Sequence, residues 1–547
     1  MPSPERTLPD RSDEIVGSLP PSFRPSQLDY LPHSVASRDG RWIVSTDTWG
    51  DRRLAEHRPD GGWHQLDTPA GWVRRPTVDG TGRLAVYQHA AAADRGCILS
   101  ERDGRWVEVA HDVEEGAICD WDGRVLARRS DGGHATAVTA TGGLVELISR
   151  RGRAALRFGS DGGALAVPPG ATVHQIVPSA DRTLMAVTLR KGARFRTVVC
   201  APSTGDVLSP RPLDAPVTRV AAWIDDHHLV AVEESWPGQS PIVWDWIDGR
   251  VDRVWSNPAA GTVRALARSS TSDEVMTATA TASAPRHLRS LHDDPSSHPD
   301  GDGTDATVVV VDNQGQNVAC IVHEPPVEPE GTVFYFPGGP HEPIWAEYSS
   351  LTAAMVGLGW RVVRVNTRSS GLREPRLRPA APFAYGLDDV ADALAAIDRL
   401  AIGPVATMGM SYGAYIACLA GERSDRCVAV AVLSGFLGVA DLLSTRHGGV
   451  AEFAAAHLRG AAANEPRRLT KNYLVAHGVA DPRIPFPAVV AHRDRADGTF
   501  LVVPLEGEGH AIHTDRAARL AYPVLFEWLQ GFAGHATRST PRSRRGR

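Results

Sequence analysis

The amino-acid sequence of 547 residues predicts two domains, an all-β propeller followed by a mostly parallel sheet with helices on both faces. Short Asp-Gly turns followed by alternating apolar residues recur in the first half, which predicts repeated β-hairpins. Short apolar runs alternate with helix-like stretches in the second half, which predicts a parallel sheet. We expect an N-terminal arm at 1–33, the propeller at 34–285, a linker at 286–304, the α/β domain at 305–533 and a basic disordered tail at 534–547.

Hairpin signals recur along the first half. They begin at Asp39, Asp79 and Asp122, about 40 residues apart. Weaker copies begin at Asp161, Asp181, Asp225 and Asp273. A period of about 40 residues is typical of propeller blades built from four short strands. The length of this half predicts six or seven blades, with seven favoured, and a pair of β-sandwiches is the alternative.

Eight short apolar runs mark the predicted strands of the second half. They lie at 308–311, 318–322, 333–336, 362–365, 405–408, 428–433, 474–476 and 500–503. Helix-like stretches such as 388–400 and 514–529 alternate with them. Because the runs are almost continuously apolar, we expect both faces of their sheet to be buried.

Composition and charge exclude several classes of protein. Apolar residues make up 42% and charged residues 22%, values typical of globular domains, and the formal net charge is −6. We therefore expect no nucleic-acid partner, and no membrane partner because the longest apolar stretch, 427–440, is too short to span a bilayer. The N-terminus lacks the apolar region of a signal peptide, which predicts a cytoplasmic protein.

The six cysteines are scattered along the chain without a Cys-x-x-Cys pair. This spacing predicts buried, reduced thiols rather than disulfides or a structural metal site. We expect neither a cofactor nor a metal ion. The sequence does not fix the oligomeric state, and a homo-oligomer is compatible with it.

The clearest chemical motif is the Gly-Met-Ser-Tyr-Gly run around Ser411, which fits the Gly-x-Ser-x-Gly nucleophile elbow. An apolar strand at 405–408 precedes it and a helix-forming run at 414–420 follows it. The glycines permit the tight, strained turn that an elbow needs. Such a turn exposes the serine hydroxyl and aims the free N–H groups of the helix at a developing anion. The motif predicts an α/β-hydrolase fold for the second domain.

A serine nucleophile needs a base and an orienting carboxylate, which follow the elbow in the order Ser, Asp, His. Asp481 follows the strand at 474–476, and His510 follows the strand at 500–503. Because the C-terminal ends of parallel strands meet at one edge of a sheet, we expect both side chains to lie beside Ser411. A turn residue and a surface histidine are the structural alternatives for these two positions.

The charged intermediate of acyl transfer needs hydrogen-bond donors for its oxyanion. The backbone N–H of Tyr412, directly after the nucleophile, is the first expected donor. The second is expected from the Gly-Gly run after the strand at 333–336, and we choose Gly339 because Pro340 has no N–H.

These motifs resemble the prolyl oligopeptidase family of serine peptidases, in particular its acylaminoacyl-peptidase-like and dipeptidyl-peptidase-like members. The matching runs are GMSYGAY around Ser411, HGVADPRIP around Asp481, GEGH ending at His510, GGPH at 338–341, and the N-x-R of Asn366 and Arg368. The resemblance implies that Ser411, Asp481 and His510 form a catalytic triad. It also implies that Arg483 contacts a substrate carbonyl.

The resemblance raises the question of an amine-binding glutamate pair, because dipeptidyl peptidases of this family use one. Glu233-Glu234 and Glu114-Glu115 are the candidate pairs. The first pair directly extends the strand at 229–232, so we expect its side chains to be solvated at a strand end rather than to bind an amine.

Together these observations predict a serine peptidase, an oligopeptidase or an acylaminoacyl- or dipeptidyl-type aminopeptidase. It would hydrolyse short peptides or acylated small molecules through an acyl-enzyme, and the resemblance implies that the propeller limits substrate size. An esterase, a thioesterase or a macrocyclising acyl transferase with the same triad is the alternative, because fold and triad do not decide the acceptor. A third alternative is a catalytically inert propeller that serves as a binding protein.

Overall fold

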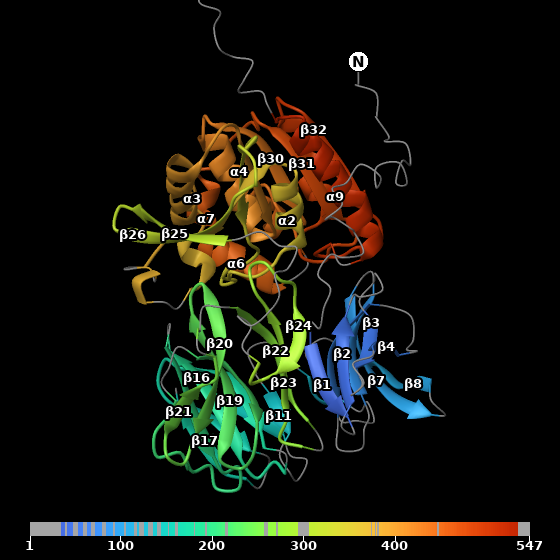
Figure 1. Ribbon diagram of the computed structural model, residues 1–547, viewed down its shortest axis with the longest axis vertical. Coiled ribbons are helices and arrows are strands. Elements are labelled where there is room, and N and C mark those ends of the chain that lie inside the picture. Colours follow the sequence, from blue (N-terminus) through green and yellow to red (C-terminus); the bar gives the residue numbers. More distant parts are fainter. Residues whose placement is uncertain are drawn as a thin grey trace, which may run out of the picture. The chain divides into compact units, whose positions relative to one another are not determined.

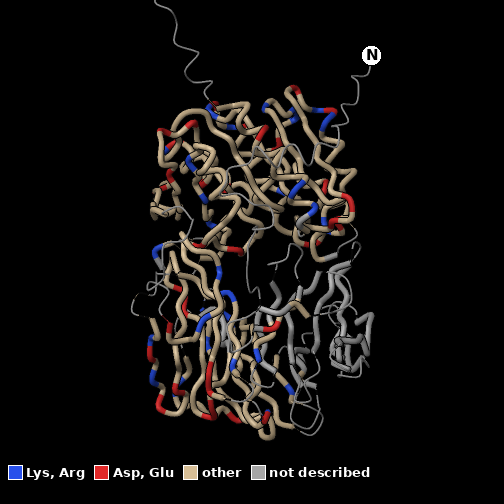
Figure 2. The backbone as a smooth tube through the Cα atoms, turned by 45° about the vertical axis from the view of Figure 1, so that its right-hand side comes forward, with Lys and Arg blue, Asp and Glu red and all other residues tan. Residues whose placement is uncertain are grey.

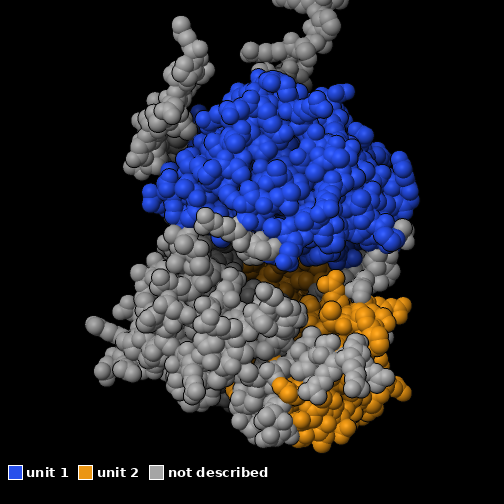
Figure 3. Space-filling view, turned by 180° about the vertical axis from the view of Figure 1, so that it is seen from behind, with its two compact units in different colours: residues 1–28, 302–344, 349–547 blue, residues 29–301, 345–348 orange. Residues whose placement is uncertain are grey.

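The computed structural model describes residues 34–293 and 306–533, with gaps. As far as residue 158 it describes mostly the strands themselves, and within 306–533 the gaps are 373–374, 378, 380–381, 446–447 and 513. The chain divides into two compact units (Figure 3). The all-β unit comprises residues 29–301 with Trp345–Tyr348, and the α/β unit includes residues 302–344 and 349–547. The predicted arm, the predicted tail and most of the predicted linker lie outside the described residues.

The all-β unit consists of small sheets that follow one another along the chain (Figure 1). Each contains two to four consecutive strands: β1–β4, β5–β8, β9–β10, β11–β14, β15–β17, β18–β21 and β22–β24. Neighbouring strands within a sheet are antiparallel, as in β18, β19 and β20. This arrangement agrees with the predicted series of hairpins, and the number of blades stays a prediction.

The strands of this unit are β1 (Ser34–Arg38), β2 (Arg41–Thr46), β3 (Arg53–His57), β4 (Trp63–Gln65), β5 (Trp72–Val78), β6 (Leu84–Ala90), β7 (Ala93–Arg102), β8 (Arg105–Val113), β9 (Ala117–Cys119), β10 (Val125–Arg128), β11 (Ala135–Val138), β12 (Leu144–Arg150), β13 (Arg153–Phe158), β14 (Ala164–Val167), β15 (Thr172–Pro178), β16 (Met185–Lys191), β17 (Arg194–Cys200), β18 (Val217–Trp223), β19 (His228–Ser235), β20 (Gly238–Asp245), β21 (Arg250–Arg253), β22 (Thr262–Arg268), β23 (Val275–Ala280) and β24 (His287–Ser290). Some of these strands show the alternating burial that follows from a two-residue period. In β14, for example, Leu165 and Val167 are buried and the residues before each of them are exposed. Trp223 and Trp244 are buried in an apolar cluster formed by strands of neighbouring sheets.

The expectation of a solvated strand end at Glu233 and Glu234 is wrong, because both residues are buried. Strand β19 continues past both glutamates and pairs with β20 along its whole length. Glu233 accepts two hydrogen bonds of 2.9 Å from the guanidinium group of Arg253 on β21. This charged partner offsets the cost of burying the Glu233 carboxylate. The Glu114-Glu115 pair lies outside the described residues.

The α/β unit is organised by a mixed eight-stranded sheet with the order β25-β26-β28-β27-β29-β30-β31-β32 (Figure 1). Its strands are β25 (Ala306–Asn313), β26 (Gln316–His323), β27 (Gly331–Phe336), β28 (Trp360–Asn366), β29 (Val405–Met410), β30 (Cys427–Leu433), β31 (Asn472–Gly478) and β32 (Phe500–Leu505). Strands β25, β26 and β28 are antiparallel neighbours, and all later pairs in the order are parallel. Each of the eight predicted runs lies within one of these strands. The C-terminal ends of β29, β31 and β32 therefore meet at one edge.

Helices cover both faces of this sheet (Figure 1). They are α2 (Ser350–Gly357), α3 (Leu387–Leu400), α4 (Tyr412–Arg423), α5 (Val439–Leu443), α6 (Gly448–His457), α7 (Arg459–Ala462), α8 (Phe486–Val490) and α9 (Asp515–Gln530), with short 3₁₀ turns η3 (Arg368–Ser370), η4 (Pro375–Leu377) and η5 (Ala491–Arg495). Phe334 and Val363 pack in the cluster that includes α3 and α4. Their neighbours Val333 and Val362 pack in the cluster that includes α2 and α9. Successive residues of a strand face opposite sides, which explains why almost continuous apolar runs are needed here.

One short segment of the second half packs in the all-β unit. The N–H of Ala346 donates to the carbonyl of Pro237 at 2.8 Å, and the N–H of Tyr348 donates to the carbonyl of Thr281 at 2.6 Å. The carboxylate of Glu347 forms an ion pair with Arg264. The all-β unit is therefore completed by residues that follow β27 in the sequence.

The remaining features of the fold are the distribution of charge, the polarity of the helices and the state of the cysteines. Acidic and basic residues are interspersed along the described backbone (Figure 2). No helix within the described residues is long and apolar enough to cross a membrane. Four cysteines, Cys200, Cys320, Cys418 and Cys427, are free and buried.

Candidate active site

Ser411 lies at the turn between β29 and α4, where the elbow motif predicts it. Its φ of +52° lies in the left-handed region, which is strained for a residue with a side chain. A Cβ atom added to Gly413 would lie 2.1 Å from the carbonyl oxygen of Pro337. A Cβ atom added to Gly409 would lie 2.2 Å from the carbonyl oxygen of Gly413. Both glycines are thus required sterically, because each collision is with backbone.

The structure brings Ser411, His510 and Asp481 together. The Oγ of Ser411 lies 2.9 Å from Nε2 of His510, and Nδ1 of the same ring lies 2.9 Å from Oδ2 of Asp481. A carboxylate can only accept a hydrogen bond, so Nδ1 carries the proton and Nε2 accepts from the serine hydroxyl. The Asp481 side chain is wholly buried, whereas that of His510 is 18% exposed. The partly exposed side chains of Ser411 and His510 can therefore meet a reactant from solvent.

Asp481 is held by several donors. Its Oδ1 accepts from the N–H groups of Arg483 at 2.8 Å and Ile484 at 2.9 Å. The wholly buried ring of His477 places Nε2 3.3 Å from Oδ2 of Asp481 and 2.9 Å from the carbonyl of Ile484. Burial raises the pKa of the Asp481 carboxyl, but hydrogen bonds from His477 and His510 outweigh burial and lower that pKa below its ordinary value. The carboxylate is therefore ionised at neutral pH.

The two backbone N–H groups expected as oxyanion donors belong to Tyr412 and Gly339. Tyr412 is the first residue of α4, so its N–H has no partner within the helix. Gly339 has a φ of +147°, which favours glycine. Among the described residues neither N–H has a protein acceptor. The loop that carries Gly339 is fixed two residues later, where the N–H of His341 donates to the carbonyl of Ser369 at 2.8 Å.

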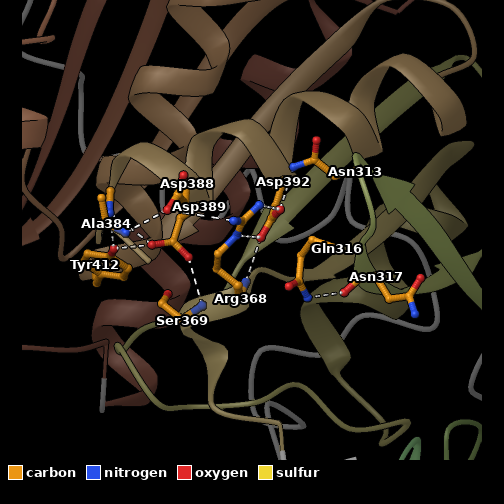
Figure 4. Close-up of polar contacts among 11 residues, drawn as sticks. Asn313, Gln316, Asn317, Arg368, Ser369, Ala384, Asp388, Asp389, Asp392 and Tyr412 are labelled. Atoms are coloured by element: carbon orange, nitrogen blue, oxygen red, sulfur yellow. Dashed lines mark hydrogen bonds and ion pairs between the residues drawn. The ribbon is translucent and has the colours of Figure 1, made fainter. Parts of the chain in front are cut away.

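The residues of the N-x-R motif support loops beside the site. Asn366 accepts from the N–H of Ile344 at 2.7 Å and donates to its carbonyl at 2.9 Å. The Nε and Nη2 atoms of Arg368 donate to the buried carboxylate of Asp392 at 3.0 and 2.6 Å (Figure 4). Both side chains therefore act inside the α/β unit rather than at its surface.

Arg483 is exposed two residues after Asp481, and its N–H donates to that carboxylate. Its role toward a substrate stays a prediction. In the part of the chain that the structure describes, no group of three or more His, Cys, Asp or Glu side chains could hold a metal ion.

Comparison with known proteins finds a family model that matches part of the α/β unit. Residues 346–536 match the model of the prolyl oligopeptidase family. This part of the chain is therefore similar to that family. A relative, acylamino-acid-releasing enzyme 2 of Oryza sativa subsp. japonica, is 31% identical over 125 residues, which are 20% of this chain and 16% of the relative. The match thus spans a small part of that relative's length.

Solved structures are similar to the chain over both units. An acylaminoacyl peptidase of Pyrococcus horikoshii has a TM-score of 0.60 at 12% identity, covering 94% of this chain and 97% of the other. A puromycin-hydrolyzing peptidase of Mycobacterium tuberculosis has a TM-score of 0.59 at 16% identity, covering 92% and 86%. At these identities the similarity shows the fold alone. It confirms the predicted combination of a unit of many small β-sheets with a following α/β-hydrolase sheet.

Two residues that contact this site were not predicted. His477 begins the HGVAD run that carries the family resemblance, but nothing local shows that its ring contacts the carboxylate four residues later. Asp389 lies in the first turn of α3, where acidic residues are common without any link to a site. Its partners Tyr412 and Ser369 are 23 and 20 residues away in the sequence, so its role depends on the fold.

Proposed function

We propose that this protein is a serine peptidase of the prolyl oligopeptidase family that cleaves short peptides or acylated small molecules through an acyl-enzyme. The observation that carries the proposal is the pair of 2.9 Å contacts from Ser411 to His510 and from His510 to Asp481. This arrangement supplies a nucleophile, its base and the group that orients the base.

The proposed reaction assigns a role to each of these groups. The Oγ of Ser411 attacks the substrate carbonyl carbon while Nε2 of His510 takes the hydroxyl proton. The carbonyl oxygen becomes negative and accepts hydrogen bonds from the N–H groups of Tyr412 and Gly339. His510 then protonates the leaving amine, the C–N bond breaks, and an ester of Ser411 remains. Water, deprotonated by Nε2 of His510, then attacks the ester carbonyl carbon, the bond to the Ser411 oxygen breaks, and His510 returns the proton to that oxygen, while Asp481 keeps the Nδ1 proton in place.

The proposed substrates have a free or acylated amino end and few residues. The names of similar proteins support this class, since they include an acylaminoacyl peptidase and a puromycin-hydrolyzing peptidase. We assign Arg483 to a substrate carbonyl and a size limit to the all-β unit. Equal rates on folded proteins and on short peptides would contradict the size limit.

Labelling with a fluorophosphonate tests the nucleophile directly. The native chain should be labelled, and Ser411→Ala should not. Ser424→Ala is the matched control, because Ser424 is a buried serine at the opposite end of α4. It should be labelled like the native chain. An unlabelled native chain, or equal labelling of Ser411→Ala, would contradict the proposal.

A panel of substrates separates peptidase from esterase or acyl transferase. It holds N-acetylated and free-amine aminoacyl anilides, puromycin, and an ester matched to each amide. A peptidase should turn over the amides at rates that Ser411→Ala abolishes. Hydrolysis of the esters alone, or cyclic products detected by mass spectrometry, would favour the alternative.

A further inference from the structure

Asp389 occupies an unusual position beside the site. Its side chain is wholly buried at the start of α3 (Figure 4). Its Oδ2 accepts from the hydroxyl of Tyr412 at 2.6 Å and from the N–H of Gly386 at 3.0 Å. Its Oδ1 accepts from the N–H of Ser369 at 3.0 Å. One buried carboxylate therefore binds three segments of the α/β unit.

One of these segments carries a proposed oxyanion donor, and another supports the loop that carries the second donor. Tyr412 supplies one donor through its own N–H, and Asp389 holds the ring of the same residue. Ser369 accepts the N–H of His341 at 2.8 Å, so it fixes the loop that contains Gly339. The two donors come from segments more than 70 residues apart in the sequence, 339 and 412, and Asp389 is bonded to the supports of both.

We propose that Asp389 is a positioning residue that sets the spacing between the Tyr412 and Gly339 donors. The inference rests on the proposed function, because it assigns these N–H groups to an oxyanion. A cap for α3 would need only the contact with Gly386. The contact with Ser369 adds nothing to the helix. The hydroxyl of Tyr412 also accepts from the N–H of Gly386 at 2.8 Å, but its residue belongs to α4, so the contacts of Asp389 with Tyr412 and Ser369 join the two sides of the oxyanion site.

The chemistry of the tyrosine agrees with this role. Burial, together with the neighbouring Asp389 carboxylate, raises the pKa of the Tyr412 hydroxyl well above its ordinary value. The hydroxyl thus remains a donor to Asp389 at neutral pH. Loss of one oxyanion donor costs about 10²–10³-fold in kcat in a serine peptidase, and displaced donors are expected to cost less.

Kinetics of Tyr412→Phe and Asp389→Asn test the proposal. We expect kcat on a peptide anilide to fall about tenfold in the first variant and about 10–100-fold in the second, with KM changed less than about twofold. Tyr415→Phe is the matched control. Tyr415 lies one turn further along α4, is equally buried, and donates to the carboxylate of Glu465 at 3.0 Å. It should keep the native kcat.

A transition-state analogue separates positioning from loss of structure. A peptide boronic acid bonded to Ser411 places an oxygen at the oxyanion site, so its affinity should fall by the same factor as kcat/KM. Binding of the uncleaved peptide, measured with Ser411→Ala added to each variant, should change less than about twofold. If Asp389→Asn fails to fold, the kinetics and boronate affinity of Tyr412→Phe test the proposal without it.

Two results would overturn the inference. One is a native kcat in Tyr412→Phe, equal to that of Tyr415→Phe. The other is a loss of peptide binding as large as the loss of boronate binding. Failure of the proposed function looks different, because the native chain itself would then show neither labelling nor turnover.

Discussion

His477 Nε2 lies 3.3 Å from Oδ2 of Asp481, the oxygen that also accepts from His510 at 2.9 Å. The side chains of His477 and Asp481 are both wholly buried. Two histidines therefore contact one carboxylate, and only one of them reaches Ser411. The second histidine acts on the charge of Asp481 and on the loop that carries it.

The acid stability of the protein should depend on His477. Because the pKa of Asp481 is lowered in the folded state, its contribution to stability is present above about pH 4, the ordinary Asp pKa, and is lost as the pH falls toward the lowered pKa. His477→Leu removes a donor and raises this pKa. We expect a lower thermal midpoint at neutral pH and a smaller decrease of the midpoint below about pH 4. Thermal unfolding followed by circular dichroism measures both.

A double variant is the control for this prediction. With Asp481→Asn in place, His477→Leu should no longer change how the midpoint depends on pH. An unchanged pH dependence in the single variant would show that His477 does not act through Asp481.

Substitution of Gly413 should disrupt the elbow. In Gly413→Ala the new Cβ would meet the Pro337 carbonyl oxygen at 2.1 Å, and neither group can move without shifting backbone. We expect a loss of about 1–3 kcal/mol in the free energy of unfolding and loss of fluorophosphonate labelling. Chemical denaturation measures the first effect.

Gly460→Ala is the glycine control in α7, because its Cβ would only touch Leu387 Cδ1 at 3.6 Å. Alanine is the better helix former, so this variant should be as stable as the native chain or more stable. Native stability of Gly413→Ala would contradict the steric argument.

Two arginines of the α/β unit should differ in their effect on stability. Arg368→Met leaves the wholly buried Asp392 carboxylate without its cationic partner, which costs about 3–5 kcal/mol for buried ion pairs. Arg468→Met removes an exposed ion pair with Asp497 and should leave the denaturation midpoint unchanged. Equal effects of the two substitutions in urea denaturation would refute this ranking.

The buried thiols should resist modification. Burial raises the pKa of the Cys418 thiol to about 12, and burial, aided by Asp392, does the same for Cys320. We expect neither to react with iodoacetamide in the native protein at about pH 8, and both to react after denaturation. Peptide mapping by mass spectrometry identifies the modified positions. Rapid alkylation of Cys418 in the native protein would show that the core between α4 and the sheet opens readily.

Much of the fold was predictable because its signals are local. The apolar runs of the α/β sheet follow from burial on two faces, and every one of them lies in an observed strand. The elbow could be found because Gly409 and Gly413 are needed by a turn of five residues. The sequence also predicted that Asp481 and His510 lie beside Ser411, because the C-terminal ends of parallel strands meet at one edge of a sheet.

The remaining features depend on contacts between distant residues. Glu233 and Glu234 look like a solvated strand end, but β19 continues through them and both are buried. Asp389 looks like an ordinary charge in the first turn of a helix, yet its partners come from η3 and α4. The sequence by itself therefore determined the period of the strands, the elbow and the order of its chemical groups, because each depends on neighbouring residues. Only the tertiary structure decided which polar side chains are buried together, because packing distant segments sets their distances and removes them from water.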